Sequence, residues 1–265
     1  MKLVIFVVFL GIGAACAQPL EAYWTTSTSS PTIEFKGAIR KVEKFVVDHR
    51  GSSGSRHLAR VFRKFHHSFL RRYEAHADFS SLFSNGTYDC LTATTLLSHI
   101  LDKLGYQCEI VETTYHIFIK VQTDEGEILL ESTDRLGGFI VGDEAIAERV
   151  AGYRSDGPRL ADRDLGDAAY RYRCSVYRTV APTDLIGLLL YNQAVKAYNQ
   201  KQWLSSAKQL EASFAQYPSD RCHELAAILL RTLHEHGEMA PEERRACLDY
   251  LVPVIVRRSG TVAAN

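Results

Sequence analysis

The stretch YDCLTATTLLSHILDKLG, residues 88–105, decides the fold. Asp89 is of the residue type that caps the N-terminus of a helix. Apolar residues then recur at intervals of three and four, which predicts a helix over about 90–104. Gly105 provides the C-terminal stop of this helix. Cys90 therefore lies at its first position.

Three strand-like segments follow the helix, at 107–112, 116–122 and 127–133. The last two are joined by TDEG, which predicts a β-hairpin. With that turn at the tip, His116 lies opposite Thr133, and Glu131 is a diagonal neighbour of His116 on the same face. A slip of one residue would instead set Asp134 opposite His116, and we keep both registers open.

These elements bring together the residues of a nucleophilic site. A thiol at a helix N-terminus faces unpaired N–H groups and the positive end of the helix dipole, so we expect the pKa of Cys90 to lie below ~8.5. His116 could take the proton, and Glu131 or Asp134 could orient the imidazole. The backbone N–H of Cys90, with a donor such as Tyr88 from the preceding loop, could bind a developing oxyanion.

The order and spacing of these segments resemble the core of the transglutaminase-like superfamily. The resemblance is carried by YDCLTATTLL at 88–97, LGY at 104–106, YHIFI at 115–119 and ILLEST at 128–133. It implies a papain-like core, in which the Cys begins a helix packed on an antiparallel sheet and the His and the acid lie on adjacent strands. The family includes peptidases, amidases, transglutaminases and members that have lost activity.

The chain departs from the family at the acid. The family usually has Asp-Pro-Thr where this chain has Glu-Ser-Thr at 131–133, so the alignment favours Glu131. Asp134 is the chemically more usual acid, and it stays a candidate.

The N-terminal segment has the pattern of an export signal. Residues 1–17 combine a positive start, an apolar run and the small-residue cleavage site ACA, which is typical of a secretory signal peptide. The apolar run is short for a transmembrane helix, which needs about 20 residues. We therefore expect an exported chain, periplasmic or secreted, with no transmembrane segment after cleavage. Lipid attachment at Cys16 is the alternative.

The rest of the chain divides by its patterns. Residues 18–32 are rich in Ser and Thr, which predicts a flexible lead-in. The transglutaminase-like domain is expected over 33–181, beginning with helices at 33–48 and 55–75. Residues 182–256 change to helical periodicity and resemble a tetratricopeptide-like unit, although the glycine expected early in that motif is absent. Residues 257–265 form a tail.

Composition excludes several classes of protein. Lys+Arg and Asp+Glu both number 31, so the chain lacks the basic excess of a nucleic-acid-binding protein. The absence of a C-x-x-C pair or of zinc-type His/Cys spacing predicts no metal site, and we expect no other cofactor. If Cys90 stays free, Cys222 and Cys247 are the expected disulfide pair, since they lie on successive helices of one segment.

These patterns together predict an α+β protein with two possible functions. The first is an exported cysteine-dependent amide hydrolase or acyltransferase, and the resemblance and the location imply peptide or cell-envelope amides as substrates. The second is a binding module with the same fold and no turnover, whose C-terminal helices dock a partner protein.

Overall fold

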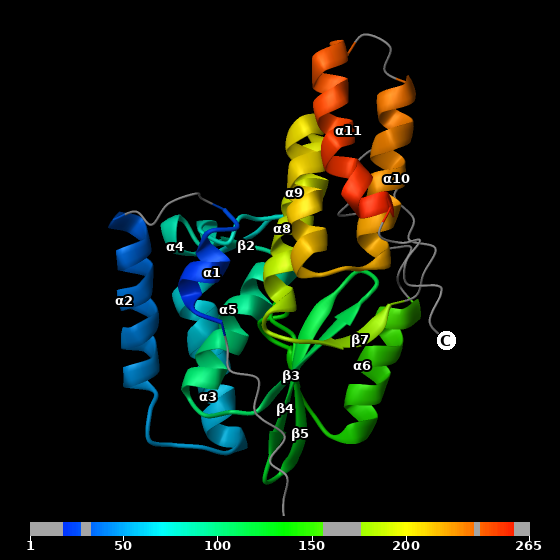
Figure 1. The fold of residues 1–265 in the computed structure, drawn as a ribbon. Coiled ribbons are helices and arrows are strands. Elements are labelled where there is room, and N and C mark those ends of the chain that lie inside the picture. The colour runs from blue at the N-terminus through cyan, green and yellow to red at the C-terminus, as the bar shows by residue number, and fades with distance from the viewer. Residues whose placement is uncertain (1–17, 28–32, 156–175, 236–238, 257–265) are drawn as a thin grey trace, which may run out of the picture.

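A five-stranded antiparallel sheet forms the centre of the structure, a computed structural model that describes residues 18–27, 33–155, 176–235 and 239–256 (Figure 1). Its strand order is β6-β5-β4-β3-β7. Helices flank both faces of the sheet, and the four helices α8–α11 extend away from one end of it. The α+β class is confirmed, with ten helices in the described ranges.

The strands and helices have the following bounds. The strands are β1 (Arg72–Tyr73), β2 (Thr87–Tyr88), β3 (Cys108–Thr113), β4 (Ile117–Thr123), β5 (Gly126–Leu130), β6 (Phe139–Val141) and β7 (Tyr177–Val180). The helices are α1 (Leu20–Trp24), α2 (Ile33–Asp48), α3 (Ser55–Phe69), α4 (Ser81–Ser84), α5 (Cys90–Lys103), α6 (Asp143–Ser155), α8 (Asp184–Asn199), α9 (Trp203–Gln216), α10 (Asp220–Glu235) and α11 (Pro241–Val256).

The β4–β5 hairpin has the first of the two registers considered from the sequence. Ile119 pairs with Leu130, and Thr123 pairs with Gly126 at the tip. Continued past the last pair, this register sets His116 opposite Thr133. β5 ends at Leu130, so Glu131 lies just beyond the strand instead of inside it.

Side chains of the central strands alternate between two cores. Ile110, Ile119 and Leu130 belong to the larger core, which contains the N-terminal helices and α5. Their sequence neighbours on the opposite face, such as Phe118 and Leu129, pack with Ile146 of α6 in a smaller core. This period of two is what a sheet covered on both faces requires.

Helix α5 begins and ends where the sequence predicts. Asp89 caps it: the Asp89 carboxylate accepts from the Thr92 N–H at 2.7 Å, while the Thr92 hydroxyl accepts from the Asp89 N–H at 2.9 Å. This reciprocal capping box holds the first turn in place. The helix packs on β3 and β4 and is buried along most of its length.

The expectation of a flexible lead-in over 18–32 is wrong for its first part. Leu20–Trp24 forms α1, and the side chains of Tyr23 and Trp24 are 0% and 1% exposed. The Tyr23 hydroxyl donates to the Pro182 carbonyl at 3.2 Å. Two large aromatic rings gain more from burial than the polar residues around them lose by ordering, which explains the difference.

Helix α3 is shorter than expected. It ends at Phe69 instead of continuing to 75, because the chain turns into β1, which pairs with β2 in a small parallel ladder. The signal peptide predicted for 1–17 and the tail at 257–265 lie outside the described residues.

The C-terminal helices have a core of their own. α9 packs against α8 and α11, and side chains of all four helices, among them Ala194, Leu210, Leu229 and Leu251, form this core. The expected disulfide between Cys222 and Cys247 is not formed, and both are free thiols. The Cys222 thiol lies instead within 3.6 Å of the Ser213 hydroxyl and 3.5 Å of the Ser219 hydroxyl.

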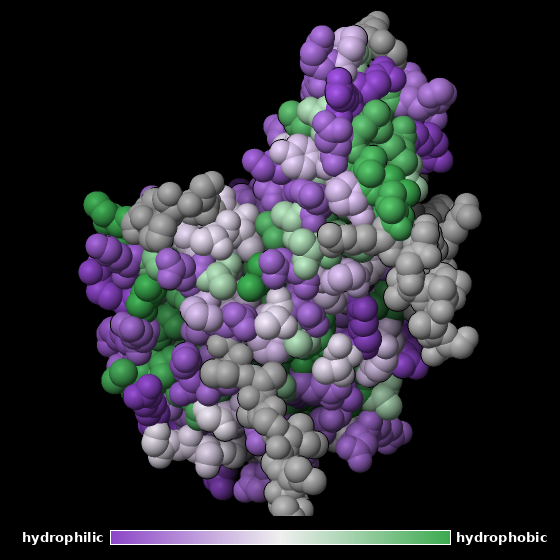
Figure 2. Space-filling view, viewed as in Figure 1, coloured by the Kyte–Doolittle hydropathy of each residue, from purple (hydrophilic) through white to green (hydrophobic). Residues whose placement is uncertain are grey.

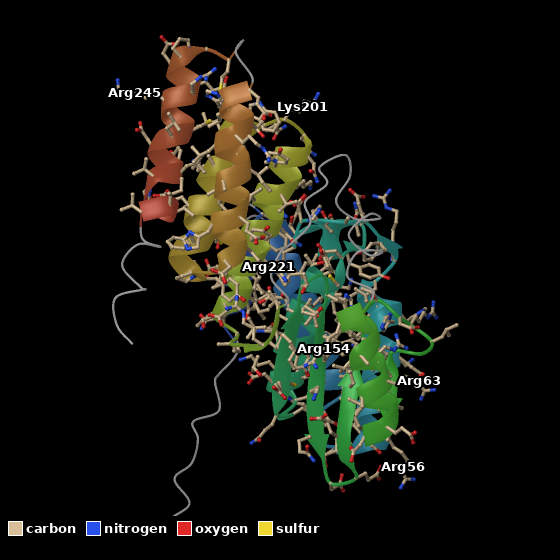
Figure 3. The ribbon with its side chains drawn as sticks, turned by 90° about the vertical axis from the view of Figure 1, so that its right-hand side faces the viewer. Arg56, Arg63, Arg154, Lys201, Arg221 and Arg245 are labelled. Carbon is tan, nitrogen blue, oxygen red and sulfur yellow. The ribbon has the colours of Figure 1, made fainter. Side chains whose placement is uncertain are left out.

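Hydrophilic and hydrophobic residues are intermixed over most of the face shown in Figure 2. Hydrophobic side chains gather on α11, where Leu248, Val252, Ile255 and Val256 are exposed. The basic side chains labelled in Figure 3 are spread along the molecule, from α3 to α11. Within the described ranges, no helix has the length and apolar character needed to cross a membrane.

Helices α8 and α9 approach closely at Gly187. A Cβ added there would lie 2.3 Å from Tyr217 Cβ and 3.0 Å from Tyr217 N. We therefore predict that Gly187→Ala lowers the free energy of unfolding by about 1–3 kcal/mol through overpacking. Urea denaturation measures this.

The matched control is Gly37→Ala in α2, where an added Cβ meets nothing within 4 Å. That change should stabilise the protein by about 0.5–1 kcal/mol, because alanine is the better helix former. A Gly187→Ala variant as stable as the wild type would contradict the close packing of α8 on Tyr217.

Candidate functional site

Cys90 occupies the first residue of α5, beside the capping residue Asp89. Its thiol is free and partly exposed. Asp89 is 2% exposed and is held from a second side, because the Asn192 side-chain amide of α8 donates to Asp89 Oδ2 at 2.9 Å. Asp89, the residue before Cys90, is therefore held both by the capping box within α5 and by a contact from the C-terminal helices.

His116 directly precedes β4, at the end of the tight turn that joins β3 to β4. The Thr113 N–H donates to the His116 carbonyl at 2.7 Å. In return the His116 N–H donates to Thr113 Oγ1 at 3.1 Å. These bonds close the turn and fix the backbone of His116, whose side chain is 12% exposed.

Glu131 lies against His116, as the first of the two hairpin registers predicts. Its Oε2 forms a hydrogen bond and an ion pair with His116 Nε2. Its Oε1 accepts from the Thr133 N–H at 2.8 Å and from the Thr133 hydroxyl at 2.6 Å. The carboxylate is thus fully engaged, and Nδ1 is the imidazole nitrogen left for the thiol.

Tyr153 of α6 completes this cluster, and the sequence analysis did not find it. Its hydroxyl donates to Glu131 Oε2 at 2.6 Å, and its ring centroid lies 4.7 Å from that of His116. The ring also stacks on Phe118. No local motif marks Tyr153, because α6 reaches the site only after it folds over the sheet.

Asp134 is not part of the cluster. Its Oδ1 accepts from the backbone N–H groups of Leu136 and Gly137 at 3.2 and 2.8 Å, and its Oδ2 pairs with Arg149 at 3.2 Å. Of the two acids considered from the sequence, the structure brings Glu131 to His116 and leaves Asp134 in the following turn.

The Cys90 thiol and the His116 imidazole line the same pocket, and each affects the pKa of the other. Burial raises the pKa of the Cys90 thiol, and the hydrogen bond and charge of His116 offset this only in part. The expectation of a lowered thiol pKa is therefore not met, because desolvation of the thiolate outweighs the stabilisation that His116 provides.

The pKa values of the His116 imidazole and the Glu131 carboxylate shift in opposite directions. Burial alone would lower the pKa of His116, but the Glu131 carboxylate and the Cys90 thiol raise it to about 10. Burial would raise the pKa of Glu131, but the charge and hydrogen bond of His116, with the bonds from Thr133 and Tyr153, lower it to about 2. At neutral pH the pair is therefore an imidazolium beside a carboxylate.

Tyr88, the expected oxyanion donor, lies in the β1–β2 ladder, where it pairs with Tyr73. Its carbonyl accepts from the Glu74 N–H at 2.9 Å. Burial, together with the charge of Glu131, raises the pKa of the Tyr88 phenol. Tyr88 is thus close enough to the cluster to sense its charge, but its backbone already takes part in a ladder. The backbone N–H of Cys90 is at the helix start, as expected.

A small pocket opens beside Cys90 and His116. Its free volume is about 100 Å³. One wall comes from the turn before β4, and the opposite wall comes from Leu188, Tyr191 and Val195 of α8. Arg221 of α10 also lines it. Among the residues that the structure describes, no group of three or more His, Cys, Asp or Glu side chains is placed to hold a metal ion.

Comparisons with protein-family models, with curated proteins and with solved structures find no match to this chain. What can be inferred about its chemistry therefore rests on the arrangement of its own side chains.

The His116–Glu131 pair makes stability depend on pH. The pKa of His116 is raised from 6.5 to about 10, so its contribution is complete below pH 6.5 and is lost as the pH rises towards 10. The pKa of Glu131 is lowered from 4.5 to about 2, so its contribution is complete above pH 4.5 and is lost as the pH falls towards 2. We predict that His116→Gln costs most between pH 4.5 and 6.5, about 3–5 kcal/mol.

Urea denaturation of both proteins across this range measures the difference in free energy of unfolding. His67→Gln, on the exposed side of α3, is the control and should show no such profile. A cost of His116→Gln that stays constant from pH 5 to pH 10 would show that the ion pair does not form.

The two acids should act unequally on His116. Glu131→Gln removes the charge that holds the imidazolium, so the pKa of His116 should fall from about 10 towards 6.5 or below. Asp134→Asn alters only the turn and the bond to Arg149, so the pKa of His116 should stay nearly unchanged. An NMR titration of the His116 ring measures both, and equal shifts in the two variants would refute the assignment of Glu131.

Proposed function

We propose that this chain is an exported cysteine-dependent amide hydrolase or acyltransferase of the transglutaminase-like type. One observation carries the proposal: the Cys90 thiol shares a pocket with the His116 imidazole, and His116 Nε2 is hydrogen-bonded to the Glu131 carboxylate. That is the order of nucleophile, proton carrier and orienting acid in a catalytic triad.

The proposed reaction begins when the Cys90 thiol gives its proton to solvent water, because His116 is already an imidazolium at neutral pH. The thiolate attacks the amide carbonyl carbon, and the C–N bond breaks as the His116 imidazolium gives its proton to the leaving amine. A thioester on Cys90 and a neutral imidazole remain. Water or an amine then attacks the thioester and gives a proton to the imidazole. The C–S bond breaks, and this releases the Cys90 thiolate and yields a carboxylic acid or a new amide.

Glu131 has an orienting role in this scheme. It binds Nε2, and this leaves Nδ1 to serve the thiol and the leaving group. Its charge also stabilises the imidazolium that is required for protonation of the amine. Tyr153 and Thr133 hold the carboxylate in place and are supporting residues.

The pocket suggests the class of substrate. At about 100 Å³ it has room for about three water molecules, well below the ≈ 300–1,000 Å³ of typical ligand sites. A short group beside the amide would fit, such as a small side chain of a peptide, and the remainder of the substrate would lie outside. Peptide and cell-envelope amides can have such a short group beside the amide. The signal-like residues 1–17 support export.

The fold assignment rests on the same elements. α5 starts with the Cys and packs on β3 and β4, and the His and the acid flank adjacent antiparallel strands. These features agree with a papain-like core and support the proposed family.

The second candidate is a binding module of the same fold without turnover. Two observations favour it: burial raises the pKa of the Cys90 thiol, which disfavours the nucleophile, and α11 presents an exposed apolar row that could meet a protein partner. The two candidates differ in one measurable property, the reactivity of Cys90.

We predict that iodoacetamide alkylates Cys90 faster than Cys108 at pH 7. Both residues are partly exposed and burial raises the pKa of both thiols, that of Cys108 to about 12, but only the Cys90 thiol has a histidine among the groups that lower its pKa. His116→Ala should slow alkylation of Cys90 at least tenfold, the effect of one pKa unit on the thiolate fraction. Peptide mass spectrometry measures both rates, with Cys90→Ala as the blank.

Turnover is tested on a set of peptide amides with small side chains. The proposed enzyme releases amine, and Cys90→Ser abolishes the release. A Cys90 that reacts no faster than Cys108, in a folded protein that releases no amine, would favour the binding module.

A further inference from the structure

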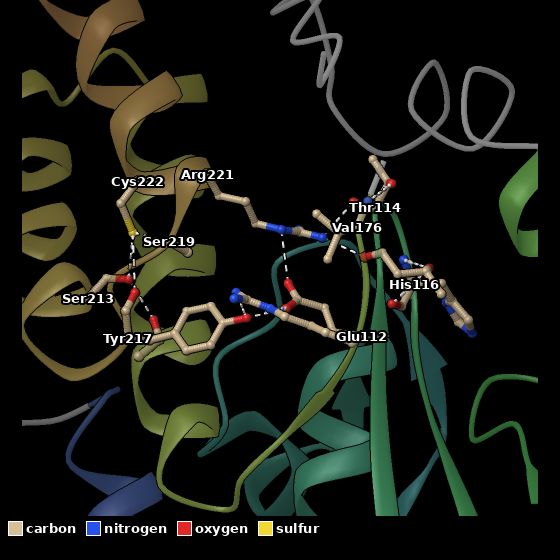
Figure 4. Close-up of polar contacts among 12 residues, drawn as sticks. Glu112, Thr114, His116, Val176, Ser213, Tyr217, Ser219, Arg221 and Cys222 are labelled. Carbon is tan, nitrogen blue, oxygen red and sulfur yellow. Dashed lines mark hydrogen bonds and ion pairs between the residues drawn. The ribbon is translucent and has the colours of Figure 1, made fainter. Parts of the chain in front are cut away.

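Arg221 connects the C-terminal helices to the turn that carries His116. It lies in the first turn of α10, and its Nη2 donates to the Thr113 carbonyl at 2.5 Å and to the Thr114 carbonyl at 2.8 Å (Figure 4). Its Nε lies 2.9 Å from Glu112 Oε1, and its side chain is 13% exposed. One guanidinium thus contacts three consecutive residues, the last two of β3 and the first of the turn that leads to β4.

Glu112 holds this guanidinium in place. The Glu112 side chain is 3% exposed, and a carboxylate so deeply buried must be paired. Besides Arg221 it contacts Arg178 Nε of β7 at 3.0 Å and the hydroxyl of Tyr217, which follows α9. Figure 4 shows Glu112, Tyr217 and Arg221 meeting at the junction between the sheet and the C-terminal helices. No motif in the sequence indicated this cluster.

The path from Arg221 to His116 is short. Thr113, whose carbonyl accepts from Arg221, is the residue that closes the turn by its bonds to the His116 N–H and carbonyl. A shift of the Arg221 guanidinium would therefore move the backbone to which the imidazole is attached. The hydrogen bond from the Val176 N–H to Thr114 Oγ1 at 2.9 Å braces the same turn.

A second contact from the C-terminal helices reaches the start of α5, where Cys90 lies. Asn192 of α8 donates to Asp89, the residue that caps α5 and precedes Cys90. Both contacts join distant parts of the chain, with separations of 103 residues for Asn192 and 108 residues for Arg221. The residue before Cys90 and the turn before His116 are thus each held by the C-terminal helices.

We propose that Asn192 and Arg221 are positioning residues that set Cys90 and His116 at their mutual distance, so that α8–α11 are an integral part of the site. The proposal rests on the proposed function. It assigns these helices a role within the chain, where the sequence suggested only the docking of a partner. Neither residue reacts; each acts through the backbone or the cap that it holds.

The test is the pH dependence of Cys90 alkylation by iodoacetamide in the full chain. Arg221→Met removes all contacts to the turn and should raise the pH midpoint by about one unit, which lowers the rate at pH 7 about tenfold. Arg221→Lys keeps the charge but lacks the forked guanidinium, so it should recover part of the rate. Arg231→Met, at an exposed position of the same helix, is the matched control and should match the wild type.

A merely structural role would lower the melting temperature without moving the midpoint. If Arg221→Met is folded by circular dichroism and keeps the wild-type midpoint, the positioning role of Arg221 is refuted. This outcome is distinct from a failure of the proposed function. The proposed function is tested in the wild-type protein, by comparing the alkylation rates of Cys90 and Cys108.

The Arg221→Met protein could instead be unfolded, because the change leaves buried Glu112 without its Arg221 partner. Asn192→Ala then decides, because it leaves the Glu112 cluster intact and removes only the amide bonded to Asp89. A lower alkylation rate at pH 7 in folded Asn192→Ala supports the proposal. A rate equal to that of the wild type overturns it.

Discussion

The burial of the Glu131 carboxylate at the end of β5 is the constraint on which the rest of the site depends. With 2% of its surface exposed, this group cannot keep its charge through contact with water and needs partners within the protein. It finds them in His116, Thr133 and Tyr153, which come from three segments of the chain. Satisfying one carboxylate therefore fixes the imidazole, the end of the hairpin and the place of α6 over the sheet.

A second buried carboxylate does the same on the neighbouring strand. Glu112 gathers Arg178, Arg221 and Tyr217, and so joins β3 to β7 and to the C-terminal helices. Breaking such a cluster by removing one partner costs about 3–5 kcal/mol, because the remaining charge stays buried. The C-terminal helices, although they have a core of their own, are thus tied to the sheet at the point where the site lies.

The state of the Cys90 thiol reflects a competition between two local effects. The helix N-terminus and the His116 imidazolium favour the thiolate, whereas the enclosure of the thiol by α8 and the β3–β4 turn disfavours it. Burial has the larger effect, because removing a thiolate from water costs more free energy than the attraction of one neighbouring cation restores. The same enclosure strengthens the ion pair between His116 and Glu131, so the site holds its proton carrier charged while its nucleophile is protonated.

The sequence by itself determined the parts of the site that depend on near neighbours. The cap and the start of α5 follow from Asp89 and the spacing of apolar residues. The turn at the hairpin tip predicted the hairpin and left two registers, of which the structure has the one that brings Glu131 to His116. Tyr153, Asn192 and Arg221 were decided only by the tertiary structure, since they lie 22, 103 and 108 residues from the groups that they contact. Local patterns specify helices, caps and turns, but no local pattern tells which distant side chain will meet a buried carboxylate. That depends on how helices dock on the sheet, and the same docking buried α1 and reversed the expected shift in the pKa of Cys90.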